Sequence, residues 1–460
     1  MAQISINDRR ARAGAGSLQP FVGGATLIGV LVSAIALGAN RPAAWSALSL
    51  WVMGMFVLQI VLDLRDPPDA RRRRVLIPAL LFAGVLAWGL LQIWPGALVG
   101  QADPAWQLVP DALPRLSLDP VQGAHVLMRL CVYGMVFWIM ARTAENAKHA
   151  QALLVTAAVF SSLLAAAGIA WAFTGNNPIL GEDATSSVSA TFVGRNAFAT
   201  YAILGLVANI ALYMERSAAG LRAAGGGQEL RDTLETFFGG AWIFALGALV
   251  CFSAILFSQS RAGSISAVLA IATVILAVTS DRRARTPLVL GVTVALVVFA
   301  GFFLSAGVSK RLMATEGDEI RFALYDRIVA AIAERPITGH GLGSFEDGMR
   351  AYLSLDLGQL EWDFAHNTHL ETVFELGLPG ALALYMALGW ITVTILLGVV
   401  RRRRNRAFSC TALACLVGTG FHAIFDFGLQ MPATAALLAA IMGMGWMQSF
   451  PAPRAQTNDA

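Results

Sequence analysis

The chain has 460 residues, of which 57% are hydrophobic and only 13% are charged, and its mean hydropathy is +0.64. A soluble domain carries a far more charged surface, so this composition indicates that the bilayer is the solvent. The formal net charge is +4. The sequence contains no basic domain that could hold a nucleic-acid duplex, so we expect no nucleic-acid partner.

Apolar runs long enough to cross a hydrocarbon core of roughly 30 Å occur along most of the chain. We predict twelve transmembrane helices, at about 21–39, 44–63, 75–93, 121–141, 152–173, 196–213, 240–257, 264–280, 288–307, 377–400, 407–425 and 433–448. The expected fold is an all-α polytopic membrane protein with one large, mostly helical outer loop. Its expected parts are a tail at 1–20, nine helices within 21–307, the outer loop at 308–376, three helices within 377–448 and a tail at 449–460.

Positive residues fall mainly on one side of this arrangement. If the amino terminus is cytoplasmic, 22 of the 33 Lys and Arg residues lie in inside segments. Apart from the 308–376 loop, the outer segments carry only Arg41, Arg115, Arg195 and Arg261. Because positive residues concentrate on the cytoplasmic side of membrane proteins, we expect both termini to be cytoplasmic.

The 308–376 loop has the pattern of an ordered structure. In "EIRFALYDRIVAAIAERP", apolar residues recur every four positions and predict an amphipathic helix that ends at Pro336, with a face made of Ile320, Leu324, Ile328 and Ile332. The segment "TGHGLGSF" then predicts a glycine turn, and "SFEDGMRAYLSL" predicts a second short helix. Loops of this length are usually functional, so we expect a lid over the helix bundle.

Three outer arginines are candidates for binding an anion. Arg195 lies in "TFVGRNAFATY" at the mouth of the sixth predicted span, Arg261 lies in the short turn "FSQSRAGSIS", and Arg321 opens the amphipathic helix. A single outer arginine can also reach lipid phosphates without any further role. The turn at Arg261 is so short that its guanidinium lies beside a helix amino end, where N–H groups favour anions. The bidentate guanidinium suits phosphate, so we interpret these arginines as a diphosphate clamp.

The stretch "FAHNTHLETVFELGLPG" places His366 and His369 at the edge of a predicted span. One interpretation is a metal pair supported by Glu371 or Glu375, which is disfavoured because the i, i+4 spacing of helical zinc sites is absent. A second is a general base that takes a proton from a hydroxyl. A third is a helix cap made with Asn367. We favour a base or substrate contact for His366 and a structural role for His369, and we expect no metal and no cofactor.

One further polar residue and one polar pair lie within or at the end of predicted spans. Arg129, in "LMRLCVYG", is a mid-span charge, which is costly and usually faces a cavity or a partner. His422 and Asp426, in "FHAIFDFGLQMP", are four residues apart and share a helix face at the outer end of the eleventh span. Both positions leave two interpretations open, contact with substrate or a structural pair.

Several separated motifs together resemble the O-antigen ligase and polymerase superfamily. They are "TFVGRNAFATY", "SQSRAG", "LYDRIVAAIAERPITGHGLGSF", "HNTHLETVFELGLPG" and the late Asp426 followed by "MP", in this order between about 190 and 435. The first third of the chain matches only in its hydropathy. Thr368 and His369 stand where the family often has a small residue and an aromatic one, and this departure leaves the role of His369 open.

The resemblance implies a fold similar to the GT-C type of lipid-linked-sugar transferases and a metal-independent, inverting glycosyltransferase of the bacterial inner membrane. Such enzymes take a glycan from undecaprenyl diphosphate at the periplasmic face and move it onto an acceptor glycan. The family residues map onto His366, Arg261 and Arg195, which we expect to be catalytic. The expected substrate-binding residues are Arg321, Asn196, Asn367, His369, Arg129 and Asp426.

The acceptor and the class of function have alternatives. A ligase joins O-antigen to the lipid A core, whereas a polymerase extends a second lipid-linked glycan for O-antigen or an exopolysaccharide; we favour the ligase. A protein of another class, a secondary transporter, also fits twelve helices with both ends inside. The clustering of polar residues on the outer side favours the enzyme. Membrane lipids are the remaining expected partner.

Overall fold

The computed structural model describes residues 2–66, 70–96, 99–181, 187–223, 240–278, 316–353, 362–402 and 406–451. Within these ranges the chain is built from α-helices and short 3-10 turns, without a β-strand. In the same ranges, eight helices contain a segment long and apolar enough to cross a membrane. The expectation of an all-α polytopic membrane protein is therefore confirmed.

These eight helices are α1 (Ala2–Ile35), α2 (Pro42–Arg65), α4 (Leu76–Ile93), α5 (Pro120–Thr143), α6 (Ala147–Thr174), α7 (Arg195–Ala223), α10 (Arg261–Val278) and α15 (Thr368–Arg401). Shorter helices in the described bundle are α9 (Trp242–Phe257), α16 (Arg406–His422) and α17 (Pro432–Gln448). Eleven of the twelve predicted spans thus coincide with helices, and the remaining one, 288–307, lies outside the described residues.

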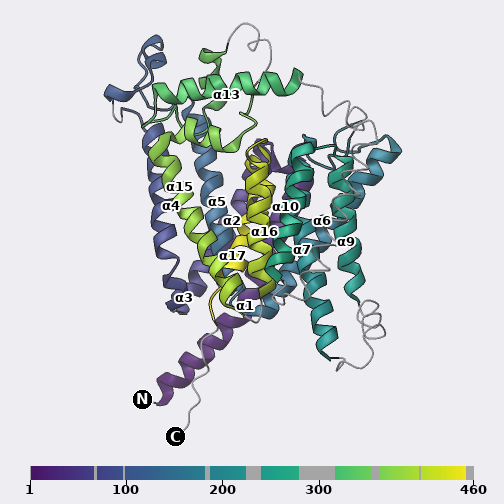
Figure 1. Cartoon of the computed structure of the whole chain (residues 1–460). Helices are drawn as coiled ribbons and strands as arrows, with labels where there is room; N and C mark the ends of the chain where they lie inside the picture. Colours follow the sequence, from purple (N-terminus) through teal and green to yellow (C-terminus); the bar gives the residue numbers. More distant parts are fainter. Residues whose placement is uncertain are drawn as a thin grey trace.

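The other described elements lie at the ends of the bundle. They are α3 (Ala70–Arg73), α13 (Glu316–Glu334), α14 (Phe345–Met349) and the 3-10 turns η1 (Leu37–Ala39), η2 (Val99–Gln101), η3 (Pro104–Leu108), η6 (Arg350–Tyr352) and η7 (Gly428–Gln430). Helix α13 runs across one end, which we call the outer end (Figure 1). The amino end of α1 and the carboxyl end of α17 lie at the opposite, inner end.

Helix α15 begins earlier than its apolar run. The predicted span starts at 377, whereas the helix starts at Thr368 because Asn367 caps it. The Asn367 side-chain oxygen accepts hydrogen bonds from the backbone N–H groups of His369 (3.1 Å) and Leu370 (3.0 Å). The helix then bends at Gly377, which has a φ of +68°. The polar stretch before the bend is therefore helical and belongs to the outer end of the bundle.

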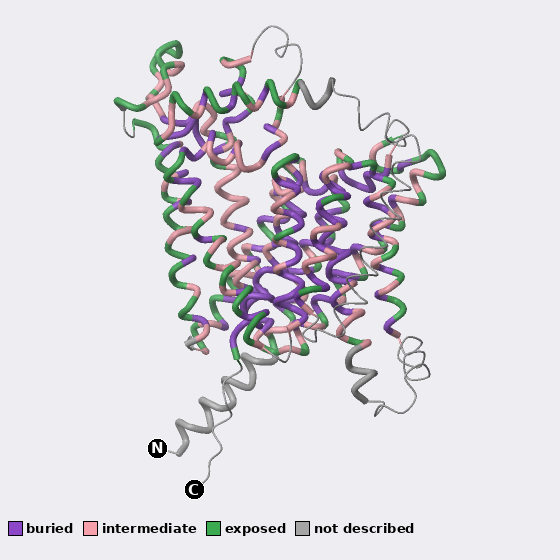
Figure 2. Tube along the Cα trace, in the orientation of Figure 1, coloured by how far each residue is buried: buried purple, intermediate pink, exposed green. Residues whose placement is uncertain are grey.

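Helix α17 forms the centre of the bundle. It contacts α1, α5, α7, α15 and α16, and nearly all of its residues are buried. Figure 2 shows buried positions concentrated in this middle region and exposed positions on the periphery. A side chain on Gly443 would collide with the carbonyl of Phe137 in α5, and one on Gly445 would collide with Ala412 in α16. Small residues thus let three helix backbones approach closely, as is usual in membrane bundles.

A network of ion pairs ties the inner ends of α2, α3 and α5. Arg142 pairs with Asp63 at 2.6 Å, and Arg72 pairs with both Asp66 and Glu145 at 2.6 Å. Burial alone would raise the pKa of Asp66, but the hydrogen bond and charge of Arg72, with the charge of Arg142, hold it below its usual value. The two buried arginines are thus compensated within the protein.

Residues 316–353, which we call the outer lid, pack over the start of α15. Leu324 and Ile328 of α13 are fully buried and pack with Phe345 of α14 and Phe374 of α15. The amphipathic pattern therefore identified these two buried positions correctly. Ile320, in contrast, is 36% exposed, so the buried face is shorter than the pattern predicted.

Gln92 anchors the lid to the membrane helices. Its side chain is fully buried at the outer end of α4 and donates to the carbonyls of Thr338 (2.8 Å) and Glu375 (2.9 Å). Its oxygen accepts a hydrogen bond from the backbone N–H of Leu342 (3.1 Å). One amide thus satisfies three backbone groups, two from the lid and one from α15, at a depth where no water replaces them.

The predicted glycine turn crosses α15 at its bend. Gly339 and Gly377 both have positive φ, and their backbones touch. A side chain on Gly339 would collide with the carbonyl of Glu375, and one on Gly377 with the carbonyl of Ile337. Only glycine permits both the conformation and the close approach.

We therefore expect Gly377→Ala to destabilise the protein. The φ of +68° and ψ of 171° are accessible essentially to glycine alone, so the substitution costs roughly 1–3 kcal/mol before the collision with Ile337 is added. Thermal unfolding of the purified protein in detergent measures this loss. Gly389→Ala is the matched control, since it lies in the same helix with nothing within 4 Å of the added carbon. Equal unfolding temperatures for the two variants would contradict the close crossing.

Candidate functional site

Two arginines open two neighbouring helices at the outer end. Arg195 is the first residue of α7 and Arg261 is the first residue of α10. The helices pack together, and Gly263 of α10 lies directly against Ala199 of α7, so their first turns are in contact. The amino end of a helix carries partial positive charge, which makes it an unfavourable place for a cation and a favourable place for an anion. Two such ends, each with an arginine, produce a local positive potential.

The turn before Arg261 is fixed by its own serines. The Ser260 hydroxyl oxygen accepts a hydrogen bond from the N–H of Gly263 (3.1 Å) and so caps α10. Gln259 adopts a φ of +58°, which lets the chain reverse between α9 and α10 within three residues. Arg261 is half-buried at this position. The expectation that a short turn confines Arg261 to the helix ends agrees with this geometry.

His366 lies in the segment that leads into α15 and has an unusual backbone, with a φ of +51°. Its side chain is 27% exposed, and its Nδ1 lies 3.5 Å from Oδ1 of Asp426. The ring packs edge-on against Phe427 at 5.0 Å and against Trp362 at 6.2 Å. Nδ1 is buried and has no hydrogen-bond partner among the described residues, whereas Nε2 is not buried in this way. The imidazole therefore turns Nδ1 toward the carboxylate and leaves Nε2 accessible.

Asp426 is the buried member of this pair. Its side chain is 1% exposed, and within the described residues neither carboxylate oxygen has a hydrogen-bond donor. His422 is close enough to interact with it electrostatically, and Nδ1 of His422 lies 2.7 Å from the Thr200 hydroxyl of α7. Polar groups therefore run from α7 through His422 and Asp426 to His366. This chain links the first turns of α7, where Arg195 lies, to the exposed imidazole.

Two hydrogen bonds hold the backbone at and next to His366. The Tyr325 hydroxyl of α13 donates to the carbonyl of His366 (2.9 Å). The buried carboxylate of Glu371 accepts from the N–H of Ala365 (2.8 Å) and lies near the side chain of Gln430. Sequence reasoning missed Tyr325 and Gln430, because no local pattern connects them with the histidine.

Asn367 and His369 have well-defined partners within the protein. Asn367 caps α15, as one of the sequence interpretations proposed. His369 donates from Nε2 to the carbonyl of Gly420 (3.1 Å), which fixes its tautomer, and its Nδ1 accepts from the Tyr385 hydroxyl (2.8 Å). Both nitrogens of His369 are therefore occupied, which argues against a metal pair with His366. No group of three or more His, Cys, Asp or Glu in the described ranges is arranged to hold a metal ion.

The remaining candidates, Arg321, Asn196 and Arg129, come from three different helices. Arg321 is four residues before Tyr325 and so shares its face of α13, which brings it toward the histidine. Asn196 is the second residue of α7, and its carbonyl accepts a hydrogen bond from Thr200 (3.2 Å). Arg129 lies apart from this group, on α5, where its guanidinium is 5.7 Å from the ring of Trp45.

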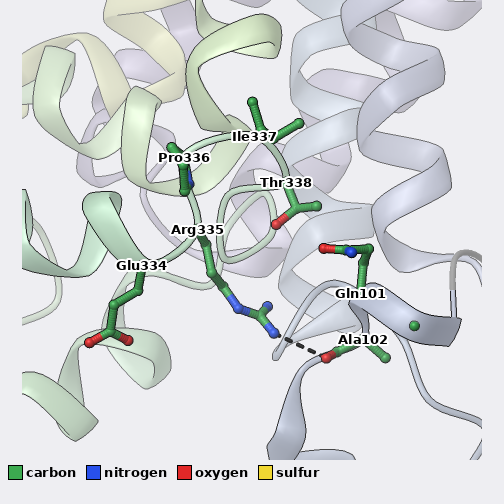
Figure 3. Close-up of a pocket in the computed structure, with 8 residues that line it drawn as sticks. Gln101, Ala102, Glu334, Arg335, Pro336, Ile337 and Thr338 are labelled. Carbon is green, nitrogen blue, oxygen red and sulfur yellow. Dashed lines mark hydrogen bonds between the residues drawn. The ribbon is translucent and has the colours of Figure 1, made fainter.

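A cavity of about 230 Å³ opens at the carboxyl end of α13, and none of the candidate residues lines it (Figure 3). Its lining residues are Gly100, Gln101, Ala102, Glu334, Arg335, Pro336, Ile337 and Thr338. The guanidinium of Arg335 donates to the Ala102 carbonyl (3.1 Å) and pairs with Asp103 (3.2 Å). Arg335 therefore connects the lid to the 99–119 segment, and we assign the cavity no part in the site.

We expect the two histidines to differ in their effect on stability. His369→Ala leaves the Gly420 carbonyl and the Tyr385 hydroxyl unpaired, which costs about 1–3 kcal/mol. His366→Ala removes a partly exposed ring without a hydrogen bond to its side chain, so its unfolding temperature should stay close to that of the unmodified protein. Thermal unfolding in detergent compares the variants directly. A larger loss for His366→Ala would show that this imidazole is a structural group.

Comparison with known families gives one match. Residues 246–385 match the family model described as O-antigen ligase. A search of curated proteins found no match. The matched segment includes Arg261, Arg321 and His366, whereas Arg195 and Asp426 lie outside it. The match confirms the resemblance that the motifs predicted: residues 246–385 are similar to the O-antigen ligase family.

Proposed function

We propose that this protein is a glycosyltransferase of the bacterial inner membrane that moves a glycan from undecaprenyl diphosphate onto an acceptor glycan at the periplasmic face. The family match supports an O-antigen ligase or polymerase type of function. Within that type we propose the ligase, which joins O-antigen to the lipid A core. The observation that carries the proposal is the accessible imidazole of His366 directed at the buried carboxylate of Asp426.

The His366–Asp426 pair suits the removal of a proton from an acceptor hydroxyl. A carboxylate beside Nδ1 holds the imidazole in the tautomer with hydrogen on Nδ1, so that Nε2 is free to accept a proton. The acceptor oxygen then attacks the anomeric carbon, a new carbon–oxygen bond forms, and the bond to the diphosphate breaks. The proton goes to Nε2 and the electron pair leaves with the diphosphate. One direct displacement of this kind inverts the anomeric centre.

The arginines at the amino ends of α7 and α10 suit the leaving group. Arg195 and Arg261 would hold the diphosphate together with the N–H groups of the two first turns. Because charge accumulates on the diphosphate as the bond breaks, fixed positive groups at this place lower the barrier. Arg321, on the lid helix α13, would contribute a third positive charge to the same group.

A polymerase is the second candidate function within the same type. Donor chemistry and the roles of His366 and the arginines are identical in the two cases, and only the acceptor differs. A secondary transporter is a candidate of another class. Against transport, the site residues lie at the outer starts of α7, α10 and α15, whereas transporters place their binding sites near the bilayer midplane.

We expect Asp426→Asn to reduce transfer strongly without loss of the folded protein. The amide keeps the shape of the side chain but removes the charge that orients His366, and such changes lower kcat by roughly 10²- to 10⁴-fold. His366→Ala should reduce transfer at least as much. Transfer of a labelled glycan from undecaprenyl diphosphate in proteoliposomes measures both. His149→Ala is the control, a histidine near the start of α6 at the inner end. Normal kcat for Asp426→Asn would reject the pair as the acid–base group.

The ligase assignment predicts which glycan accumulates when the protein is absent. Without ligation, finished long chains remain on undecaprenyl diphosphate, and gel analysis of the lipid-linked fraction from a deletion strain would reveal them. Single repeat units in that fraction would reject ligation and favour polymerisation. A lipid-linked fraction identical to that of the parent strain, together with uptake of a solute by proteoliposomes, would reject glycosyl transfer.

A further inference from the structure

Arg129 is a cation in a membrane-spanning helix, and its contact with the ring of Trp45 leaves its N–H groups without an acceptor among the described residues. It lies nine residues after the start of α5 at Pro120, about 14 Å along the helix. Within the described residues its guanidinium has no hydrogen bond and no ion pair, and the side chain is only partly buried. A charged group at such a depth is costly and usually serves a ligand or a pathway. Its five N–H donors are therefore available to an anion.

Gln122, His125, Arg129 and Trp45 form a cluster in the outer half of the membrane region, which we call the cage. The guanidinium lies 5.7 Å from the ring of Trp45, and the ring of His125 lies 4.7 Å from the same indole. Nδ1 of His125 is 3.3 Å from the side chain of Gln122. Gln122, His125 and Arg129 are spaced i, i+3 and i+7, which places all three on one face of the helix. Trp45, in the first turn of α2, forms the apolar side of the cage.

Glu375 of α15 is the acidic residue that interacts with Arg129. Its carboxylate is near enough to interact with Arg129 electrostatically, yet the two do not form an ion pair. The carboxylate lies near the backbone N–H groups of Gly343 and Phe345 in the lid. Glu375 is thus close to Arg129 without occupying its donors.

The cage and the arginines of α7 and α10 lie on different sides of one helix. Helix α17 packs against α5, and η7, which precedes it, packs against α7. His366 lies over Phe427, the residue that precedes η7. The candidate base is therefore placed near the outer start of α17, with Arg195 on the α7 side and Arg129 on the α5 side. A transfer between two lipid-linked molecules needs such an arrangement, with one head group on each side of the base.

We propose that Arg129, with His125 and Gln122, binds a phosphate of the acceptor lipid, as a second anion site distinct from that of the donor diphosphate. This inference rests on the proposed function and identifies the acceptor as a phosphate-bearing lipid. A bidentate guanidinium supplies the main contact. Rotation of the Gln122 amide lets it donate to Nδ1 of His125, which leaves the proton on Nε2 for the phosphate. The phosphate belongs either to lipid A or to a second undecaprenyl diphosphate.

Native mass spectrometry of the purified full-length protein tests the proposal. The probes are undecaprenyl diphosphate and bisphosphorylated lipid A, with undecaprenol and dephosphorylated lipid A as lipids that lack the anion. Arg129→Gln should weaken binding of one phosphate-bearing lipid by about 10- to 100-fold, because charged hydrogen bonds are lost. Binding of the lipids without phosphate should not change. Arg115→Gln is the matched control, since Arg115 also lies over an indole, at 5.3 Å from the ring of Trp106.

The outcomes separate the two sources of phosphate. Loss of lipid A from Arg129→Gln supports the site with a ligase acceptor, and loss of one of two bound undecaprenyl diphosphates supports it with a polymerase acceptor. If Arg129→Gln binds both lipids as tightly as Arg115→Gln does, the second site is rejected. Should Arg129→Gln fail to fold, His125→Ala replaces it, with an expected loss of about 2- to 10-fold.

Arg261→Gln separates this inference from the proposed function. It should weaken only the binding of the donor, undecaprenyl diphosphate. Unchanged donor binding by Arg261→Gln, together with weakened binding by Arg129→Gln, would reject the donor clamp and keep the second site. Weakened donor binding with unchanged behaviour of Arg129→Gln and His125→Ala would keep the clamp and reject the second site.

Discussion

Burial of the Asp426 carboxylate is the constraint on which the outer end of the structure depends. A charge removed from water without hydrogen bonds costs several kcal/mol, so it persists only where nearby groups recover that energy. Here the buried group beside it is the imidazole of His422, whereas the imidazole of His366 is partly exposed and contributes less. Thr368 holds the start of α15 against the turn that contains Asp426. Its hydroxyl donates to the carbonyl of Asp426 (2.9 Å), and its N–H donates to the carbonyl of Ala423 (2.8 Å). The start of α15 and the turn after α16 are thereby joined, and the pair is positioned before any substrate binds.

Contacts at the start of α15 also account for the strained backbone at His366. A non-glycine residue with a φ of +51° is held there at a cost of order 1–3 kcal/mol, which surrounding contacts must offset. Tyr325 of the lid and Glu371 of α15 supply those contacts on the two sides of the histidine. Because Tyr325 belongs to α13, the position of the imidazole depends on the docking of the lid, which Gln92 anchors to α4. Movement of α13 would therefore shift the candidate base and Arg321 together.

Some of this arrangement could be predicted from local sequence patterns, and some could not. Apolar runs identify the membrane helices, and the spacing of Leu324 and Ile328 identifies the buried face of α13, because both signals depend on neighbours within a few turns. Arg261 was placed correctly at a helix end because the turn before it is short. The contact between His366 and Asp426 joins residues sixty positions apart (366 and 426), and the contacts of Gln92 join it to residues more than two hundred positions away. No periodicity encodes such contacts, which arise only when the helices pack.

The packing of α17 bears on the choice between transfer and transport. A transporter must open a path through the centre of its bundle, along which polar groups replace the hydration of the substrate. In the described bundle this centre is occupied by a helix whose residues are nearly all buried and whose glycines touch the backbones of α5 and α16. Opening it would separate three closely packed helices and expose apolar side chains. The polar groups instead lie above the outer start of α17, with positive charge on the α7 side and on the α5 side. Such a surface suits the transfer that we propose, in which two anionic head groups meet and neither of them crosses the membrane.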